Sequence, residues 1–191
     1  GGGLSKEYAP KAVESGALVI DNSSAFRMDE EVPLVVPEIN PEQAIRHQGL
    51  IANPNCSTIQ MVVALNPIHC AADIRRVVVS PYQAVSGAGA SAMEELKQQL
   101  RAWARNEPME QEVFPVQIAF NLLPHIDVFM KNGYTREEMK MVEETRKIMN
   151  APEMRISATC VRVPVLRAHS EAVWVETEKG LSETEARSLF E

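Results

Sequence analysis

Cys56 is the residue of this sequence best placed to act as a nucleophile. It stands in "NPNCSTIQMVVAL", where Pro54 fixes the backbone before Asn55 and apolar residues with helix-like spacing follow. A thiol at the first turn of a helix faces unpaired backbone N–H groups, which favour the thiolate. The alternative is a small buried residue, because free cysteines usually belong to a core. Cys70 and Cys160 lie inside apolar patterns and are expected to be structural.

A nucleophile needs a partner that handles protons, and His169 is the strongest candidate among the four histidines. It lies between "ISATCVRVPVL" and "SEAVWVETE", two segments whose apolar residues alternate as in strands. A histidine at a strand end can point into a cleft and shuttle protons, although a structural histidine is the alternative.

Arg162 lies within the first of these two strands, among apolar residues. A guanidinium in such a place needs an anionic partner or an exposed face. Two interpretations remain open, an edge-strand arginine that reaches solvent and a fork that binds a carboxylate through two hydrogen bonds.

Two further features could contribute to a site. Ser86 and Gly87 belong to a turn of small residues before a predicted helix, and such a turn lets a ligand approach the backbone closely. Glu137 and Lys140 are three residues apart in the first turn of another predicted helix and therefore share a face, which by default is solvated. No histidines, cysteines or carboxylates have the spacing of a metal site, so we predict no metal.

The elements that must position these residues follow an α/β pattern. Helical patterns are predicted for residues 4–15, from Cys56 onward, for "SAMEELKQQLRAWARN", and from the capping box of Thr135 and Glu138 to about Met149. Strands are predicted for "ALVID", for "GLIAN", for "IRRVVVS" and for the two segments that flank His169. Residues 107–133 are expected to be irregular. The second half therefore predicts a mixed or antiparallel sheet with helices on it.

The composition excludes several classes of protein. The net charge is −7, and nucleic-acid binding needs a basic face, so a nucleic-acid partner is disfavoured. No apolar stretch approaches the roughly 20 residues of a membrane span. Three cysteines, an odd number, favour a reducing compartment, and we expect a cytoplasmic protein. The chain opens with three glycines and no methionine, so we expect a piece of a longer protein.

Taken together, the motifs resemble the aspartate-β-semialdehyde dehydrogenase family over nearly all of the 191 residues. Asn55 and Ser57 flank the cysteine where the related N-acetylglutamyl-phosphate reductases usually carry glycine and an aromatic residue, so the aspartate branch is favoured. The resemblance rests on "DNSSAFRMD", "NPNCSTIQ", "YQAVSGAG", "YTREEMKM" and "VRVPVLRAHSEAV".

The resemblance implies the NADPH-dependent reduction of aspartyl-4-phosphate to aspartate 4-semialdehyde, a step in lysine, threonine and methionine biosynthesis. Cys56 would form an acyl-thioester and His169 would be the acid–base group. The other implied residues are Gln83, Arg162, Glu137 and Asn55 for the substrate, Arg27 and Lys140 for phosphate, and Gly1, Gly2, Ser86 and Gly87 for NADP.

For the architecture, the resemblance implies a remnant of a Rossmann-like NADP-binding domain over residues 1–55. Residues 56–191 would form a mixed-sheet α+β catalytic and dimerisation domain, truncated at its C-terminus, in a homodimer. The first βαβ unit of the nucleotide domain is missing from this sequence, so we expect the isolated chain to bind NADP weakly and to turn over little substrate. The alternatives are a related acyl-phosphate reductase of the N-acetyl-γ-glutamyl-phosphate type and an inactive dimerisation module.

Overall fold

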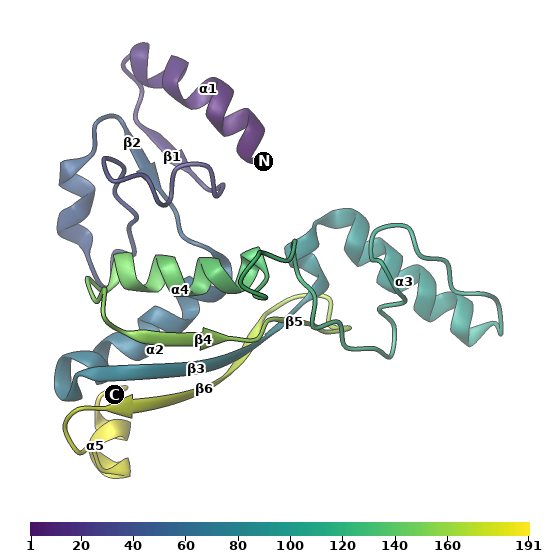
Figure 1. The fold of residues 1–191 in the computed structure, drawn as a ribbon. Coiled ribbons are helices and arrows are strands. Elements are labelled where there is room, and N and C mark those ends of the chain that lie inside the picture. The colour runs from purple at the N-terminus through teal and green to yellow at the C-terminus, as the bar shows by residue number, and fades with distance from the viewer. The chain divides into compact units, whose positions relative to one another are not determined.

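The chain contains both helices and strands, as the sequence predicts for an α/β protein (Figure 1). The computed structural model describes residues 1–191, which divide into two units. Unit 1 consists of Gly1–Val77, Lys140–Ile156 and Val175–Glu191, and unit 2 consists of Val78–Met139 and Ser157–Trp174. None of the helices combines the length and the apolar character needed to cross a bilayer.

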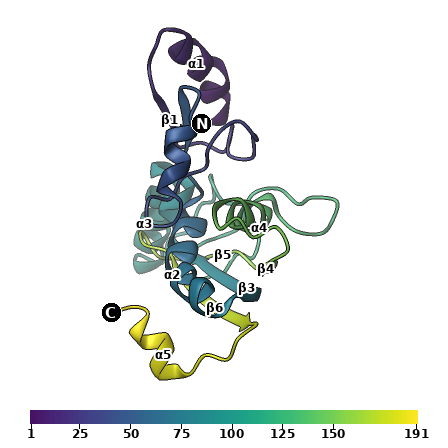
Figure 2. The same cartoon turned by 90° about the vertical axis from the view of Figure 1, so that its left-hand side faces the viewer.

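Unit 1 begins with a helix and two short parallel strands. Helix α1 (Gly2–Glu14) contacts β1 (Val19–Asp21) (Figure 2), and β1 pairs with β2 (Leu50–Ala52). The loop between the strands contains a 3₁₀-helix, η1 (Pro41–Arg46), and otherwise lacks regular structure, as its prolines predict. Helix α1 starts two residues before the expected residue 4.

Helix α2 (Cys56–Ala72) follows β2 in the same unit. It buries Met61, Val62 and Leu65, whose spacing places them on one face. The helix ends where Asp73 adopts a left-handed backbone conformation with φ of 54°. The predicted start at Cys56 is confirmed.

The larger sheet has four strands, and β3 (Ile74–Gln83) pairs with each of the others. Strands β4 (Arg155–Ala158) and β5 (Val161–Arg162) follow one another along the same side of β3, and β6 (Ser170–Thr177) also pairs with β3. Strand β5 is parallel to β3, with Gln83 opposite Arg162. The single strand expected over residues 156–166 is therefore divided into β4 and β5.

The chain has three further α-helices. They are α3 (Ala90–Ala104), α4 (Arg136–Ile148) and α5 (Glu183–Ser188). The predicted capping box opens α4, because Glu138 accepts from the N–H of Thr135 at 2.7 Å and Thr135 Oγ1 accepts from the N–H of Glu138 at 3.3 Å.

The long segment after α3 is irregular, as predicted, yet it is fixed to that helix. Gln99 Oε1 accepts from the backbone N–H groups of Ile118 at 3.1 Å and Ala119 at 2.9 Å. The apolar core beneath it contains Val85 and Leu96, both almost fully buried. A buried polar side chain therefore ties a strand-free segment to a helix within unit 2.

Candidate active site

Cys56 is the first residue of α2 and is exposed. The side chain of Asn55 caps this helix, with Oδ1 accepting from the N–H of Ser57 at 3.0 Å and of Thr58 at 3.3 Å. The thiol thus stands at the positive end of a 17-residue helix, which favours its thiolate form. The interpretation of Cys56 as a buried core residue is wrong.

The other two cysteines differ from Cys56. Cys160 is buried, and burial raises the pKa of its thiol, with the nearby carboxylates of Glu137, Glu138 and Glu171 adding to the effect. That environment suits the structural role expected of Cys160. Cys70 is exposed on α2 although it lies inside an apolar pattern, and its structural role stays a prediction.

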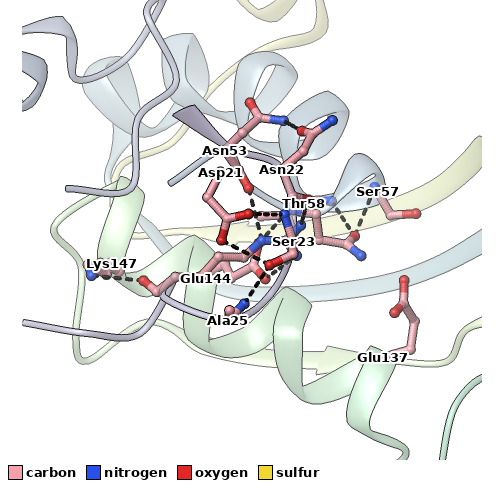
Figure 3. A network of polar contacts seen from close by, with 12 residues as sticks. Asp21, Asn22, Ser23, Ala25, Asn53, Ser57, Thr58, Glu137, Glu144 and Lys147 are labelled. Carbon is pink, nitrogen blue, oxygen red and sulfur yellow. Dashed lines mark hydrogen bonds and ion pairs between the residues drawn. The ribbon is translucent and has the colours of Figure 1, made fainter. Parts of the chain in front are cut away.

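Arg27 and Glu144 form a buried ion pair, and Figure 3 labels Glu144. Glu144, on α4, is only 1% exposed. Its Oε1 accepts from Arg27 Nη1 at 3.0 Å and its Oε2 accepts from the N–H of Asn55 at 2.7 Å. Arg27 also donates from Nε to the carbonyl of Asn53 at 2.9 Å and from Nη2 to that of Asn22 at 3.0 Å. Unit 1 therefore brings together two predicted site residues, Arg27 and Asn55.

Glu144 was not among the site residues predicted from the sequence. The residue shares a helix face with Lys140, because the two are four residues apart, and this spacing was the available signal. Lys140 itself is half-buried on α4, three residues after the buried Glu137, so the default interpretation of this pair as a solvated face is wrong.

A second cluster of predicted residues lies in unit 2. Gln83, the last residue of β3, is 2% exposed and donates from Nε2 to Glu137 Oε1 at 3.1 Å. Arg162 lies opposite Gln83 in the sheet and is 6% exposed. An arginine this buried does not reach solvent, so the edge-strand interpretation of Arg162 is wrong.

His169 precedes β6, at the predicted strand end, and is joined to Arg162 through one backbone residue. Arg162 Nη1 donates to the carbonyl of Ala84 at 2.8 Å, and the N–H of Ala84 donates to His169 Nδ1 at 3.0 Å. An accepting Nδ1 assigns the proton of the neutral ring to Nε2. Burial first and the positive charge of Arg162 second lower the pKa of His169, against an opposing contribution from Glu137.

The turn of small residues also reaches this cluster. Ser86 and Gly87 lie in a 3₁₀-helix, η2 (Val85–Ala88). A Cβ added to Gly87 would lie 2.9 Å from Arg162 Nη1 and 3.5 Å from His169 Nε2. Only glycine fits beside these two side chains without displacing them.

Gly1 and Gly2, the remaining predicted cofactor residues, lie at the start of α1. That helix is fixed to β1 through Asp21, which accepts from Ser5 Oγ at 2.7 Å and from Ser23 Oγ at 2.9 Å. Burial alone would raise the pKa of Asp21, but these hydrogen bonds and the charge of Arg27 together lower it. The cofactor role of the two glycines stays a prediction.

Known family models match most of the chain. The model described as "Semialdehyde dehydrogenase, dimerisation domain" matches residues 65–191, and the one described as "Semialdehyde dehydrogenase, NAD binding domain" matches residues 1–47. The boundary that we expect after residue 55 stays a prediction.

Curated relatives and solved structures agree with these matches. The aspartate-semialdehyde dehydrogenases of Aquifex aeolicus and Bacillus subtilis are 61% and 55% identical over 100% and 94% of this chain. The chain spans only 57% and 54% of their lengths.

Aspartate semialdehyde dehydrogenase II from Vibrio cholerae, 52% identical, superimposes over 98% of this chain and 57% of its own with a TM-score of 0.97. A second structure of that enzyme, 51% identical, is described as complexed with ASA and gives the same TM-score over 98% of this chain and 56% of its own. An enzyme from Candida albicans with NADP, 24% identical, covers 99% of this chain and 52% of its own at a TM-score of 0.71 and shares the fold. The chain belongs to the aspartate-semialdehyde dehydrogenase family.

Proposed function

We propose that this chain carries the catalytic residues for the NADPH-dependent reductive dephosphorylation of L-aspartyl-4-phosphate to L-aspartate 4-semialdehyde. The observation that carries the proposal is the exposed thiol of Cys56 at the capped N-terminus of α2. Covalent catalysis suits an acyl phosphate, because one difficult displacement becomes two easier steps.

In the first step the Cys56 thiolate attacks the acyl carbon. A C–S bond forms, the C–O bond to phosphate breaks, and phosphate leaves with the electron pair. NADPH, when bound, supplies the hydride that reduces the resulting thioester. The hemithioacetal then collapses, which returns the thiolate to Cys56 and releases the aldehyde.

His169 would stabilise the oxygen that becomes negative in both steps. Its Nδ1 accepts from Ala84, so Nε2 carries the proton that such an oxygen would share. A proton on Nδ1 would point at the N–H of Ala84 and break the hydrogen bond between them. The lowered pKa of His169 keeps the ring neutral as the pH falls. The acid–base role implied for His169 takes this form in our proposal.

Charged side chains would bind the remaining groups of the substrate. We assign Arg162 to the α-carboxylate, because a planar guanidinium binds a carboxylate through two hydrogen bonds. Glu137 would accept from the substrate ammonium while Gln83, already donating to Glu137, orients the substrate. Lys140 and Arg27 would contact the phosphate, where positive charges stabilise the breaking C–O bond, and Asn55 would contribute to the substrate site.

The residues present fit a nicotinamide cofactor at one place in particular. Gly87 is exposed and has no side chain, which would let a flat ring approach the backbone of Ser86 and Gly87. Gly1 and Gly2 would hold the cofactor phosphates at the start of α1. A match to an NAD-binding family model over residues 1–47 supports this assignment.

The assembly that we propose is a homodimer formed through residues 56–191, and the dimerisation domain matched at residues 65–191 supports it. Residues 1–55 would be the nucleotide-binding part. We expect a small-molecule substrate, no nucleic-acid partner and a cytoplasmic location.

The first step needs no cofactor, which makes it the sharpest test. Mixed with aspartyl-4-phosphate, the chain is expected to release one phosphate per chain and to gain a hydroxylamine-labile adduct on Cys56, located by peptide mass spectrometry. N-acetylglutamyl phosphate in place of aspartyl phosphate tests the related reductase. Acylation by neither compound would support an inactive dimerisation module and contradict the proposal.

A further inference from the structure

We propose that Glu144 is a positioning residue for Cys56, a role that rests on the proposed function of that thiol. A carboxylate that is 1% exposed is costly unless both of its oxygens have partners. Here the two oxygens accept from different parts of the chain, 117 and 89 residues away at Arg27 and Asn55. A single side chain of α4 therefore joins the loop that carries Arg27, between β1 and β2, to the start of α2.

These contacts hold both sides of Pro54. Glu144 accepts directly from the N–H of Asn55, which follows the proline. Arg27, paired with Glu144, donates to the carbonyl of Asn53, which precedes it. Since Pro54 fixes its own φ, the tripeptide before Cys56 is constrained along its whole length.

Asn55 is consequently held at two points. Its N–H donates to Glu144 at 2.7 Å, and its side chain accepts from the N–H groups of Ser57 and Thr58. The backbone at Asn55, with φ of −61° and ψ of 144°, directs the chain into the helix at Cys56. A shift of Glu144 would move this residue and therefore the thiol that follows it.

Lys147 supports the same arrangement one turn further along α4. Its Nζ donates to the carbonyls of Arg27 at 2.8 Å, Asp29 at 2.6 Å and Val32 at 2.9 Å. Figure 3 shows Glu144 and Lys147 on the same helix. Glu144 binds the guanidinium of Arg27, and Lys147 binds the backbone of Arg27. Helix α4 therefore determines the position of Arg27, the residue that we propose binds the phosphate.

The test uses Glu144→Gln, which keeps the size of the side chain but removes its charge. Glu143→Gln, an equal charge change at an exposed neighbour, is the matched control. For each variant we compare phosphate release from saturating aspartyl-4-phosphate with the rate at which iodoacetamide alkylates Cys56. The ratio of the phosphate-release rate to the alkylation rate corrects for any change in the thiolate fraction of Cys56.

We expect Glu144→Gln to lower the ratio about tenfold or more, because small displacements of reacting groups are costly, and Glu143→Gln to leave it unchanged. A lower unfolding temperature with an unchanged ratio would show a merely structural role and overturn the proposal. Absence of acylation in the parent chain would instead refute the proposed function, and this inference with it.

If Glu144→Gln does not fold, the double variant Arg27→Met/Glu144→Met removes both charges and leaves no unpaired ion buried. Loss of a phosphate contact at Arg27 alone would raise the KM for aspartyl-4-phosphate. Loss of positioning would lower the limiting rate relative to alkylation, and an unchanged limiting rate would contradict the role of Glu144.

Discussion

Helix α2 carries an exposed cysteine near each end, and the surroundings of the two thiols differ. At the N-terminus, Cys56 follows a capping asparagine whose N–H is bound by the buried Glu144. Near the C-terminus, Cys70 lies 3.8 Å from Asn66 Oδ1, and the helix ends at Asp73, whose carboxylate forms an exposed ion pair with Lys179 at 2.6 Å. The residue type and the helix are the same, but the direction of the helix dipole relative to each thiol is opposite.

We expect the proposed reactivity of Cys56 to come from the backbone at the helix start and from the side chains that hold it. The N–H groups at a helix start stabilise an anion, whereas the carbonyl groups at a helix end destabilise one. Cys70, which is also exposed, is therefore an internal control for Cys56.

The largest expected effect separates the two thiols directly. Cys56→Ser should lower acylation by aspartyl-4-phosphate about a thousandfold or more, because it removes the nucleophile. Cys70→Ser should leave the rate unchanged. Phosphate release in a single-turnover assay measures both, and an equal loss in the two variants would contradict the comparison.

The second effect concerns the histidines. His69, beside Cys70, accepts from the N–H of Ile74 through Nδ1 at 3.0 Å, in the way that His169 accepts from Ala84. We expect His169→Ala to slow acylation about a hundredfold, the usual loss for one donor to a developing oxyanion, and His69→Ala to have no effect.

The pH dependence of acylation tests the role of His169 further. The pKa of His169 is lowered from 6.5 by burial first and by the charge of Arg162 second, so the neutral, active ring persists as the pH falls through 6.5. A rate normalised to iodoacetamide alkylation of Cys56 should decrease only below that pH. A decrease that begins above pH 6.5 would argue against the neutral ring.

A smaller effect is expected from the helix cap. Asn55→Ala removes the acceptor of two N–H groups and should cost about 1 kcal/mol of stability while slowing alkylation of Cys56 severalfold. Asn66→Ala, near Cys70, is the matched change and should not lower stability, because alanine favours helix. Thermal unfolding gives the stability of both variants, and alkylation kinetics give the reactivity of Cys56 in each. Equal losses of stability in the two variants would contradict the capping role of Asn55.

The smallest effect is expected at the far end of the helix. Asp73→Gly relieves a left-handed backbone but removes an exposed ion pair, two contributions of opposite sign. The unfolding temperature should change by less than about 4 °C, the shift for roughly 1 kcal/mol in a chain of this size, and alkylation of Cys56 should not change. A slower reaction at Cys56 would show that the two ends are coupled.

Local patterns were enough to predict the elements that carry the site. Pro54 and the apolar spacing after Cys56 predicted the start of α2, and the capping box at Thr135 predicted the start of α4. Both signals lie within a few residues of the feature that they predict. For the same reason, the alternation around His169 correctly predicted a histidine at a strand end.

Contacts between distant residues could not be predicted in this way. Glu144 binds groups 89 and 117 residues away, and no pattern within α4 indicates such partners. The burial of Arg162 depends on its pairing opposite Gln83 in the sheet, and the exposure of Cys70 depends on which face of α2 is covered. Tertiary packing determines these features, and the spacing of residues along the chain carries no information about that packing.

The most direct test of the central claim measures alkylation of the three cysteines in one sample of the unmodified chain. With substoichiometric iodoacetamide at pH 7, peptide mass spectrometry should find Cys56 modified at least about ten times faster than the exposed Cys70, because a helix N-terminus raises the thiolate fraction. The buried Cys160 should remain unmodified and thereby report that the chain is folded. Alkylation of Cys70 as fast as or faster than that of Cys56, with Cys160 still protected, would contradict the assignment of Cys56 as the nucleophile.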